Sequence, residues 1–238
     1  MYGGQYRGDI GIDATGNVAR ITLDEHVSAV DFAPLFKDLF KTNRVAGKGS
    51  ANIKVAGAGR TTDDVVKTLD GNVDFNVADG ALEGVDLVYE IRRARALLKQ
   101  QPAPERTGAA RTPFNALAGS GVMKDGVLTN NDLNAATQYL KVTGQGTVDL
   151  PQSLLDYRLT AAILKSPPAG AQSADSPADL KDLVEAQIPI RLTGPLTDPK
   201  VRVDIEGLVK NEAKQRLEKE KSKVEEKLKD KLKDIFKR

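Results

Sequence analysis

Apolar and polar residues alternate most clearly in Leu69–Leu87, whose sequence is LDGNVDFNVADGALEGVDL. Val73, Phe75 and Val77 occupy every second position, with polar residues between them. This period of two predicts a strand with one apolar and one solvated face. Asp79-Gly80 is expected to end the strand in a tight turn, because glycine adopts positive φ at no steric cost.

The same signal recurs along most of the chain. Residues 119–128 close on a second Asp-Gly pair, at 125 and 126, which again predicts a turn. Further strands are expected at 5–13, 18–27, 46–59, 114–123, 127–133, 139–150, 155–164, 188–192 and 201–205. Helices are expected at 32–40, at 62–68 behind a Thr61–Asp64 capping box, at 86–100 and at 176–187.

The pattern favours a mainly β (α+β) fold. About ten strands would span on the order of 50 Å, so the sheet must close, coil or have its apolar face covered. Four Gly-x-Gly pairs (47/49, 57/59, 119/121 and 144/146) each remove side chains from one face. Such pairs allow a sharp bend or the close approach of a helix or ligand, although they also occur as weak strand filler near turns. We expect a long, strongly twisted antiparallel sheet curled into a groove or partial barrel, with a few packed helices.

Two parts are predicted. Residues 1–206 form the curled β-sheet domain with helical insertions, and flexible loops are expected at about 101–112 and 166–177. Residues 207–238 are rich in Lys and Glu and predict a C-terminal amphipathic helix. Its narrow apolar stripe includes Leu217, Val224, Leu228, Leu232 and Ile235. Such a stripe suits docking on a groove edge, a partner helix or a membrane surface, and a solvated helix is the equally weighted alternative.

The composition of the chain argues against several classes of function and site. The net charge is +2, so no strong whole-chain field attracts nucleic acid. The absence of cysteine excludes disulfides and thiolate sites. No apolar run approaches the ~20 residues that cross a bilayer. Because the chain enters a strand pattern directly after Met1, we expect that any targeting segment lies upstream in a longer natural chain.

No catalytic or metal-binding motif is identified, so no enzymatic activity and no cofactor are expected. Residues 70–81 begin like a calcium loop, but Phe75 replaces the required glycine and Ala81 the final glutamate. His26 is the only histidine, which argues against zinc sites and Ser/His catalysis. No Gly-x-Gly pair has the third glycine of a dinucleotide loop.

A series of short segments, in order, resembles the C-terminal region of the AsmA family of bacterial envelope proteins. The segments are Leu69-Asp70-Gly71 to Asp79-Gly80, Gly84-Val85-Asp86-Leu87, Phe114-Asn115-Ala116-Leu117, Asp125-Gly126-Val127-Leu128, Asp132-Leu133, Gly144-x-Gly146-Thr147-Val148-Asp149-Leu150, Leu155-Asp156-Tyr157, Ile188-Pro189-Ile190-x-Leu192-x-Gly194 and Asp198-Pro199. Any one segment is weak evidence, whereas the ordered series is fairly specific.

The resemblance implies a periplasmic, inner-membrane-anchored protein of outer-membrane biogenesis. Larger relatives are thought to carry phospholipid along a β groove, which implies that this chain is a lipid-binding or lipid-transport module. The resemblance implies no catalytic residues at any position of this chain. A phospholipid or other acyl-chain ligand is the expected partner. Further expected partners are the inner membrane, reached through a segment that this chain lacks, and envelope or outer-membrane proteins.

The apolar positions of the predicted strands are the candidate lipid-contacting residues, because an acyl chain would cover them as well as protein does. They are Ile53, Val55, Val73, Phe75, Val77, Val148, Leu150, Ile188, Ile190 and Leu192. The alternative function is a non-enzymatic scaffold or chaperone that assists outer-membrane protein assembly and binds client strands at an open sheet edge. A hydrolase that uses scattered carboxylates is the third and least favoured hypothesis.

Overall fold

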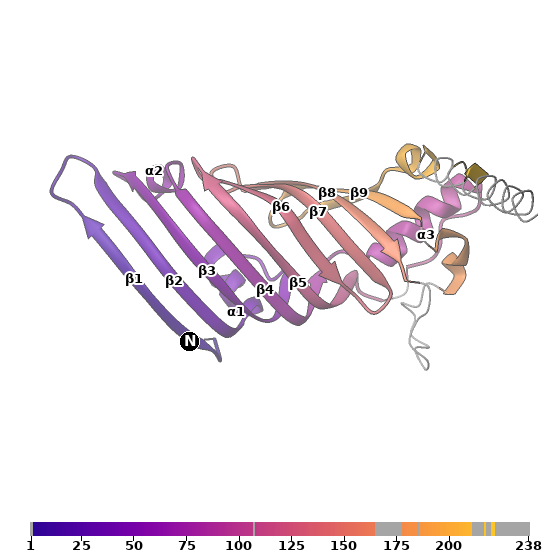
Figure 1. Ribbon diagram of the computed structural model, residues 1–238, viewed down its shortest axis with the longest axis horizontal. Helices are drawn as coiled ribbons and strands as arrows, with labels where there is room; N and C mark the ends of the chain where they lie inside the picture. The colour runs from indigo at the N-terminus through magenta and orange to yellow at the C-terminus, as the bar shows by residue number, and fades with distance from the viewer. Residues whose placement is uncertain are drawn as a thin grey trace, which may run out of the picture.

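The fold is a ten-stranded antiparallel sheet in which the order of the strands across the sheet is their order along the chain (Figure 1). It is seen in a computed structural model that describes residues 2–106, 108–164, 178–184, 186–210, 217, 220 and 221. The strands are β1 (Gln5–Asp13), β2 (Ala19–Asp31), β3 (Val45–Gly59), β4 (Asp70–Glu83), β5 (Arg111–Lys124), β6 (Val127–Ala136), β7 (Leu140–Asp149), β8 (Leu154–Ile163), β9 (Gln187–Pro195) and β10 (Lys200–Val203). Because β1 and β10 do not pair with each other, the sheet is open. The predicted fold class is therefore confirmed.

Short helices connect the strands close to the segments that were predicted to be helical. They are α1 (Phe32–Phe40), α2 (Thr62–Val66), α3 (Leu87–Leu98) and the 3-10 helix η1 (Ala178–Leu183), and residues 205–210 are also helical. Thr61 and Asp64 form the predicted capping box of α2. The Asp86 carboxylate accepts the Tyr89 backbone N–H at 2.8 Å and so fixes the start of α3.

The two faces of the sheet differ in polarity, as the alternation predicts. Cross-strand neighbours share a face, so one row of neighbours can be followed across many strands. An apolar-face row contains Val30, Gly49, Val77, Leu117, Ala135, Val142, Ala161 and Ile188. A row on the opposite face contains Asp9, Asp24, Lys54, Asn72, Val122, Thr129, Thr147, Asp156, Thr193 and Lys200. The apolar face is therefore continuous across the sheet.

The two Asp-Gly pairs behave differently. Asp125-Gly126 forms the expected two-residue turn between β5 and β6, with positive φ at both residues (49° and 75°). The turn predicted at Asp79-Gly80 is wrong, because β4 continues through this pair to Glu83. Asp79 adopts a φ of 47° there, and the pair lies opposite the single residue Gly47. The pair therefore forms a β-bulge, which bends the strand without ending it.

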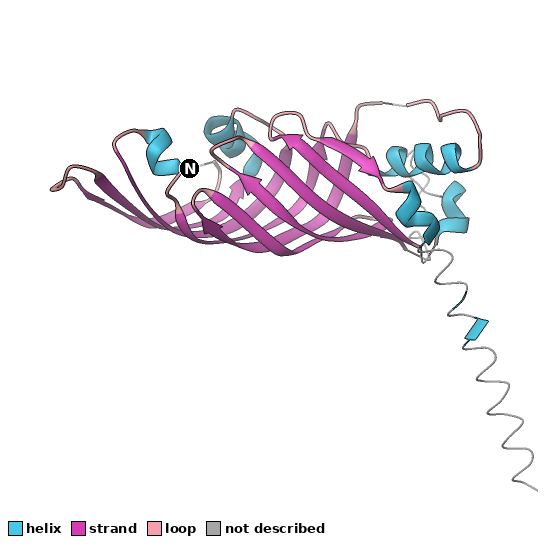
Figure 2. Ribbon diagram, turned by 90° about the horizontal axis from the view of Figure 1, so that it is seen from above, coloured by secondary structure: helices cyan, strands magenta, loops and turns pink. Residues whose placement is uncertain are grey.

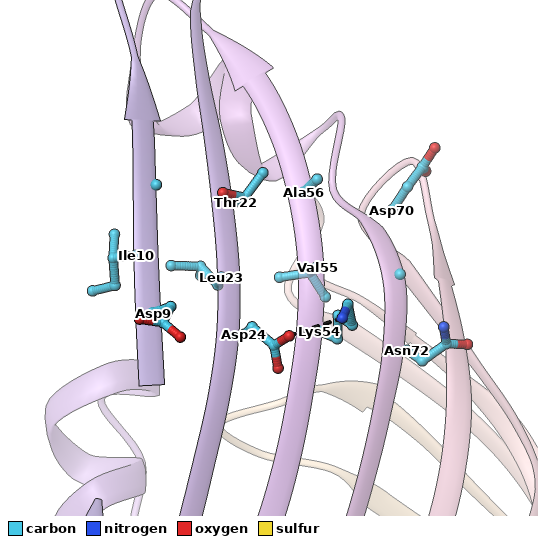
Figure 3. Close-up of a pocket in the computed structure, with 12 residues that line it drawn as sticks. Asp9, Ile10, Thr22, Leu23, Asp24, Lys54, Val55, Ala56, Asp70 and Asn72 are labelled. Carbon is cyan, nitrogen blue, oxygen red and sulfur yellow. Dashed lines mark hydrogen bonds and ion pairs between the residues drawn. The ribbon is translucent and has the colours of Figure 1, made fainter. Parts of the chain in front are cut away.

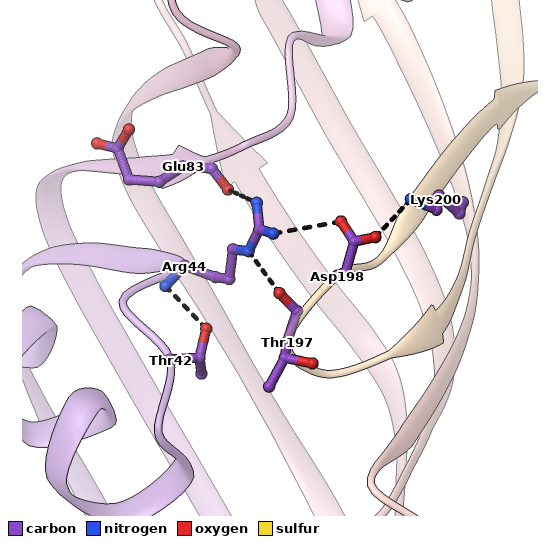
Figure 4. Close-up of polar contacts among 6 residues, drawn as sticks. All are labelled: Thr42, Arg44, Glu83, Thr197, Asp198 and Lys200. Carbon is purple, nitrogen blue, oxygen red and sulfur yellow. Dashed lines mark hydrogen bonds and ion pairs between the residues drawn. The ribbon is translucent and has the colours of Figure 1, made fainter.

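The sheet is strongly twisted and curled, and helical segments gather at its C-terminal end (Figure 2). The curl brings the turn between β9 and β10 to the start of β3 (Figure 4). Here the Arg44 guanidinium donates to the backbone oxygen of Thr197 at 2.9 Å and to that of Glu83 at 3.3 Å. Arg44 thereby joins strands that are far apart in the order of the sheet.

Two hydrophobic clusters cover parts of the apolar face. Near the N-terminal end, Phe32 of α1 packs with Val30, Ala51, Val77 and Phe114. At the C-terminal end, apolar residues of α3, η1 and Leu208 pack on β7, β8 and β9. The helices thus cover the two ends of the face more fully than its middle.

Candidate apolar binding face

A band of half-buried apolar residues, here called the central band, lies on the apolar face. Its residues are neither fully exposed nor part of the fully buried core, so each keeps some accessible surface. The central band consists of Ile53, Val73, Phe75, Leu128, Leu133, Val148, Leu155, Leu192 and Val201. Ile53 and Val73 are direct cross-strand neighbours and belong to neither hydrophobic cluster. The central band therefore leaves accessible apolar surface on this face of the sheet.

The predicted lipid-contacting residues fall into two groups. Five of them, Ile53, Val73, Phe75, Val148 and Leu192, lie in the central band, and the half-buried Leu150 directly follows β7. The other four, Val55, Val77, Ile188 and Ile190, are 7%, 3%, 0% and 1% exposed. These four side chains are already covered by protein, so they support the face and offer little surface to a ligand.

The Gly-x-Gly pairs are filled by the protein itself. A Cβ atom at Gly49 would lie 2.9 Å from the Phe32 ring of α1, and one at Gly59 would lie 2.4 Å from the Val65 nitrogen of α2. At the other two pairs, side chains of the adjacent strand lie over the glycine. The Tyr157 ring, for example, would be 2.5 Å from a Cβ atom at Gly146. The glycines therefore allow helices and large side chains to lie flat on the sheet.

Two polar side chains interrupt the apolar face. Asn130 is 1% exposed and lies in the same cross-strand row as Val73 and Tyr157. Its amide nitrogen donates to the Ser120 backbone oxygen at 2.6 Å and to the Asp132 carboxylate at 2.7 Å. Its amide oxygen has no hydrogen-bond partner among the described residues. Asn130 thus spans the place where the register shifts between β5, β6 and β7.

Glu25 is the second polar side chain, and it lies in the row of Ile53. The Tyr6 hydroxyl is close enough to the Glu25 carboxylate to raise the pKa of Tyr6. Neither Glu25 oxygen, however, makes a hydrogen bond of normal geometry with a described residue. The phenol of Tyr157 lies further along this row, and burial, with a smaller contribution from Asp132, raises its pKa to about 12. The row therefore contains neutral and acidic groups but no cation on the apolar side.

A shallow hollow of about 590 Å³ lies across the N-terminal end of the sheet, between β1 and β4 (Figure 3). The Ile10, Leu23 and Val55 row contributes to its lining, together with the polar rows on either side. The Lys54 ammonium forms a 2.8 Å ion pair with the Asp24 carboxylate in this lining. The hollow is therefore of mixed polarity, unlike the central band.

Known proteins share sequence with this chain. The model of the AsmA family matches residues 1–133, which is more than half of the chain. The chain belongs to the AsmA family. Protein AsmA of Escherichia coli (strain K12) is 24% identical over 230 residues, which cover 91% of this chain and 35% of that protein. No solved structure matches the chain significantly.

Membership of the AsmA family confirms the resemblance that the sequence segments indicated and suggests an envelope protein with an outer-membrane-related role. This AsmA-family chain spans about a third of the length of the E. coli protein. Among the described residues, no helix is long and apolar enough to cross a membrane. The same residues contain no cluster of three or more His, Cys, Asp or Glu side chains that could hold a metal ion.

Most of the C-terminal stripe of this AsmA-family chain lies outside the described residues, namely Val224, Leu228, Leu232 and Ile235. Leu217 is described, is helical and is 58% exposed. The predicted loop at 166–177 also lies outside the described residues. The docking of the C-terminal helix therefore stays a prediction.

Sequence reasoning missed four members of the central band, Leu128, Leu133, Leu155 and Val201. Leu128 and Leu155 lie directly opposite Val148 on the two neighbouring strands. Their contribution depends on strand register, which local alternation does not reveal. Asn130 could have been noticed, because it occupies an apolar position of the alternation two residues after Leu128.

Proposed function

We propose that the central band binds the acyl chains of a phospholipid or similar lipid, so that the chain acts as a lipid-binding module in outer-membrane biogenesis. The half-buried but still accessible apolar surface along one face of a curled sheet carries this proposal. Each methylene group moved from water onto such a surface contributes about 0.8 kcal/mol. An acyl chain therefore makes a favourable cover for residues that α1, α2 and α3 leave accessible.

The ligand class follows from the chemistry of the face. Apart from the buried Asn130, the apolar-face side chains of the middle strands are mostly aliphatic or aromatic, whereas charged groups gather on the opposite face. A long hydrocarbon fits such a surface better than a sugar, nucleotide or metal complex, which would require several convergent polar groups. The family suggests an envelope role, and lipids are the envelope's most abundant source of hydrocarbon chains. Periplasmic location and anchoring to the inner membrane in the full-length protein belong to this proposal.

Lipid binding is tested by a pair of substitutions on adjacent residues of β4. Val73→Asp places a carboxylate in the central band, whereas Asn72→Asp places the same group on the opposite face. Lipid is extracted from each purified protein and quantified by mass spectrometry, and circular dichroism checks the fold. We expect Val73→Asp to lose the co-purified lipid and Asn72→Asp to keep it. Phe75→Asp should also lose the lipid, with Asn76→Asp as its control.

A well-folded wild-type protein that carries no lipid and binds no fluorescent fatty acid would exclude lipid binding. Equal loss of lipid in Val73→Asp and Asn72→Asp would show that lipid contacts something other than the central band. Comparing the two variants matters because Val73 packs on the sheet, and a general loss of stability must be separated from a loss of binding surface.

The second candidate function is a scaffold that holds client strands, and the outer edge of β1 favours it. This edge pairs with no other described strand, and eight of its nine residues are exposed. An extended peptide could add to it by backbone hydrogen bonds. Crosslinking of an outer-membrane strand peptide to β1 that persists after delipidation supports this function, and crosslinking that disappears with the lipid counts against it.

A further inference from the structure

A cavity of about 570 Å³ lies between α3 and β10. This volume is within the range of roughly 300–1,000 Å³ that small-molecule sites occupy. Leu97 of α3, Val201 of β10 and Ile205 contribute apolar side chains to the lining. Val201 is also a member of the central band and lies directly opposite Leu192, another member. The cavity and the central band therefore meet at Val201.

Charged side chains distinguish this cavity from the central band, whose members are all aliphatic or aromatic. The Asp86 carboxylate belongs to the lining but is already used, because it accepts the Tyr89 backbone N–H as the cap of α3. The other charged residues of the lining are the carboxylates of Glu90 and Asp198 and the cations Arg93, Arg106, Lys200 and Arg202. Cations are therefore in excess at the cavity.

On the α3 side of the cavity, two guanidinium groups share one carboxylate. Glu90, whose side chain is only 15% exposed, pairs with Arg93 at 3.3 Å and with Arg106 at 3.4 Å. The Arg106 guanidinium also lies over the Tyr89 ring, 4.5 Å from its centroid, and this contact holds it beside α3. Neither guanidinium pairs with a second carboxylate of the described residues, so most of their N–H donors stay available.

The strand side of the cavity repeats this arrangement (Figure 4). The Asp198 carboxylate accepts from the Arg44 guanidinium at 3.3 Å and also from the Lys200 ammonium. Arg202, two residues further along β10, is exposed and makes no hydrogen bond or ion pair with a described residue. Each of the two shared carboxylates is thus neutralised by two cations, and Arg202 adds a further positive charge.

We propose that this cavity binds the phosphate-bearing headgroup of a lipid whose acyl chains lie on the central band, and that it selects anionic headgroups over zwitterionic ones. The inference rests on the proposed lipid-binding function and specifies its ligand. A phosphate group accepts hydrogen bonds through several oxygens, which suits guanidinium and ammonium donors on two sides of a cavity. The ammonium of a zwitterionic headgroup would instead face an excess of cations, because Glu90 and Asp198 are already shared.

Three short-chain lipids with identical acyl chains test the headgroup site. Dihexanoyl-phosphatidylglycerol carries an anionic headgroup, dihexanoyl-phosphatidylcholine carries a zwitterionic one, and dihexanoylglycerol carries no phosphate. Isothermal titration calorimetry of the delipidated protein measures the dissociation constant of each lipid. We expect the anionic lipid to bind about tenfold more tightly than the other two, which is the effect of one additional charge-assisted contact.

A double variant, Arg106→Gln with Arg202→Gln, removes one cation from each side of the cavity. It should bind the anionic lipid about tenfold more weakly and dihexanoylglycerol as tightly as the wild type does. Arg202→Gln alone breaks no contact among the described residues, so its partial loss of selectivity cannot be attributed to misfolding. The matched control is Arg7→Gln with Arg158→Gln, because both arginines are exposed on strands and neither lines the cavity. This control should bind all three lipids as the wild type does.

The outcomes separate the headgroup site from lipid binding itself. Equal dissociation constants for the three lipids in the wild type, or an equal loss of affinity in the control pair, would overturn the headgroup site and leave lipid binding by the central band intact. Val73→Asp should weaken all three lipids and keep the preference for the anionic one. A wild type that binds none of the three would overturn both proposals. Glycerol 3-phosphate that binds as tightly as the anionic lipid would assign the cavity to a soluble phosphate compound and overturn its link to the central band.

Discussion

The Arg44 guanidinium lies 3.3 Å from the Asp198 carboxylate, although 154 residues separate the two in sequence. Together with the bonds from Arg44 to the Thr197 and Glu83 backbone oxygens, this contact closes the curl between the start of β3 and the β9–β10 turn. Arg44 is about one-quarter exposed, so its hydrogen bonds are only partly shared with water. The curvature of the apolar face thus depends on a contact between distant parts of the sheet.

Arg44→Ala should lower the free energy of unfolding by about 1–2 kcal/mol, because two backbone oxygens and a carboxylate lose a charged donor. Urea denaturation measures the change. Lys200→Ala is the matched control, since it removes the other cation beside Asp198 from a pair that is exposed on both sides. That control should change stability little. Equal effects of the two substitutions would show that Arg44 is one more surface charge and does not hold the curl.

Asn130 should be the most sensitive polar residue of the apolar face. Asn130→Ala would leave the Ser120 backbone oxygen and one Asp132 oxygen without their short hydrogen bonds from the amide. Loss of buried hydrogen-bond partners costs about 1–3 kcal/mol. Asn131→Ala, at the exposed neighbouring position, should change the free energy of unfolding by about 0.5 kcal/mol or less. If the two variants had the same free energy of unfolding, the Asn130 side chain would not stabilise the fold through its hydrogen bonds.

Asp132 should contribute to acid sensitivity. Hydrogen bonds from the Ser120 hydroxyl and backbone N–H, with a further bond from Asn130, hold the pKa of Asp132 below its usual value. A folded-state pKa below the unfolded value of about 3.9 stabilises the fold above that pH, and this stability is lost as pH falls through the folded-state pKa. In the Asp132→Asn variant, the free energy of unfolding should therefore fall less steeply than in the wild type as the pH is lowered below about 5.

The measurement for Asp132 is the urea midpoint at several acidic pH values. Glu105→Gln is the control, because Glu105 is exposed and makes no hydrogen bond with a described residue. The control should follow the wild-type profile. An Asp132→Asn profile that coincides with that of the wild type would show that another carboxylate governs the acid response.

Sequence periodicity predicts this fold well where the decisive interactions are local. Val73, Phe75 and Val77 share a face because side chains alternate along any strand, and Asp86 caps α3 through a contact three residues away. The pattern also predicts that the apolar face continues across the sheet.

Contacts between distant segments explain what sequence reasoning could not provide. Whether Ile190 is covered and Ile53 is accessible depends on where α3, η1 and Leu208 pack, and no local pattern encodes this. Arg44 could not be recognised, because its partners come from another region of the chain. Asp79-Gly80 has the composition of a turn, but pairing with β3 and β5 on both sides keeps β4 intact through the bulge. Tertiary pairing here overrides local turn preference.

The glycines of the apolar face should be needed for close packing and not for flexibility alone. Gly146 is the sharpest case, because a Cβ atom there would lie 2.3 Å from the Asp156 backbone oxygen and 2.5 Å from the Tyr157 ring. Backbone on one side and a buried ring on the other leave little room for adjustment. Gly146→Ala should therefore destabilise the protein by about 1–3 kcal/mol through overpacking.

Gly16→Ala is the matched control for Gly146→Ala. The nearest atom to a Cβ atom at Gly16 is the Val18 backbone oxygen at 3.9 Å, so the added methyl group meets open space. Thermal and urea denaturation should show a stability for Gly16→Ala that is equal to or slightly above that of the wild type, because alanine restricts the unfolded chain. If Gly146→Ala gained stability in the same way, the Tyr157 ring would not require a glycine beneath it. The close packing of side chains over the Gly-x-Gly pairs would then need another cause.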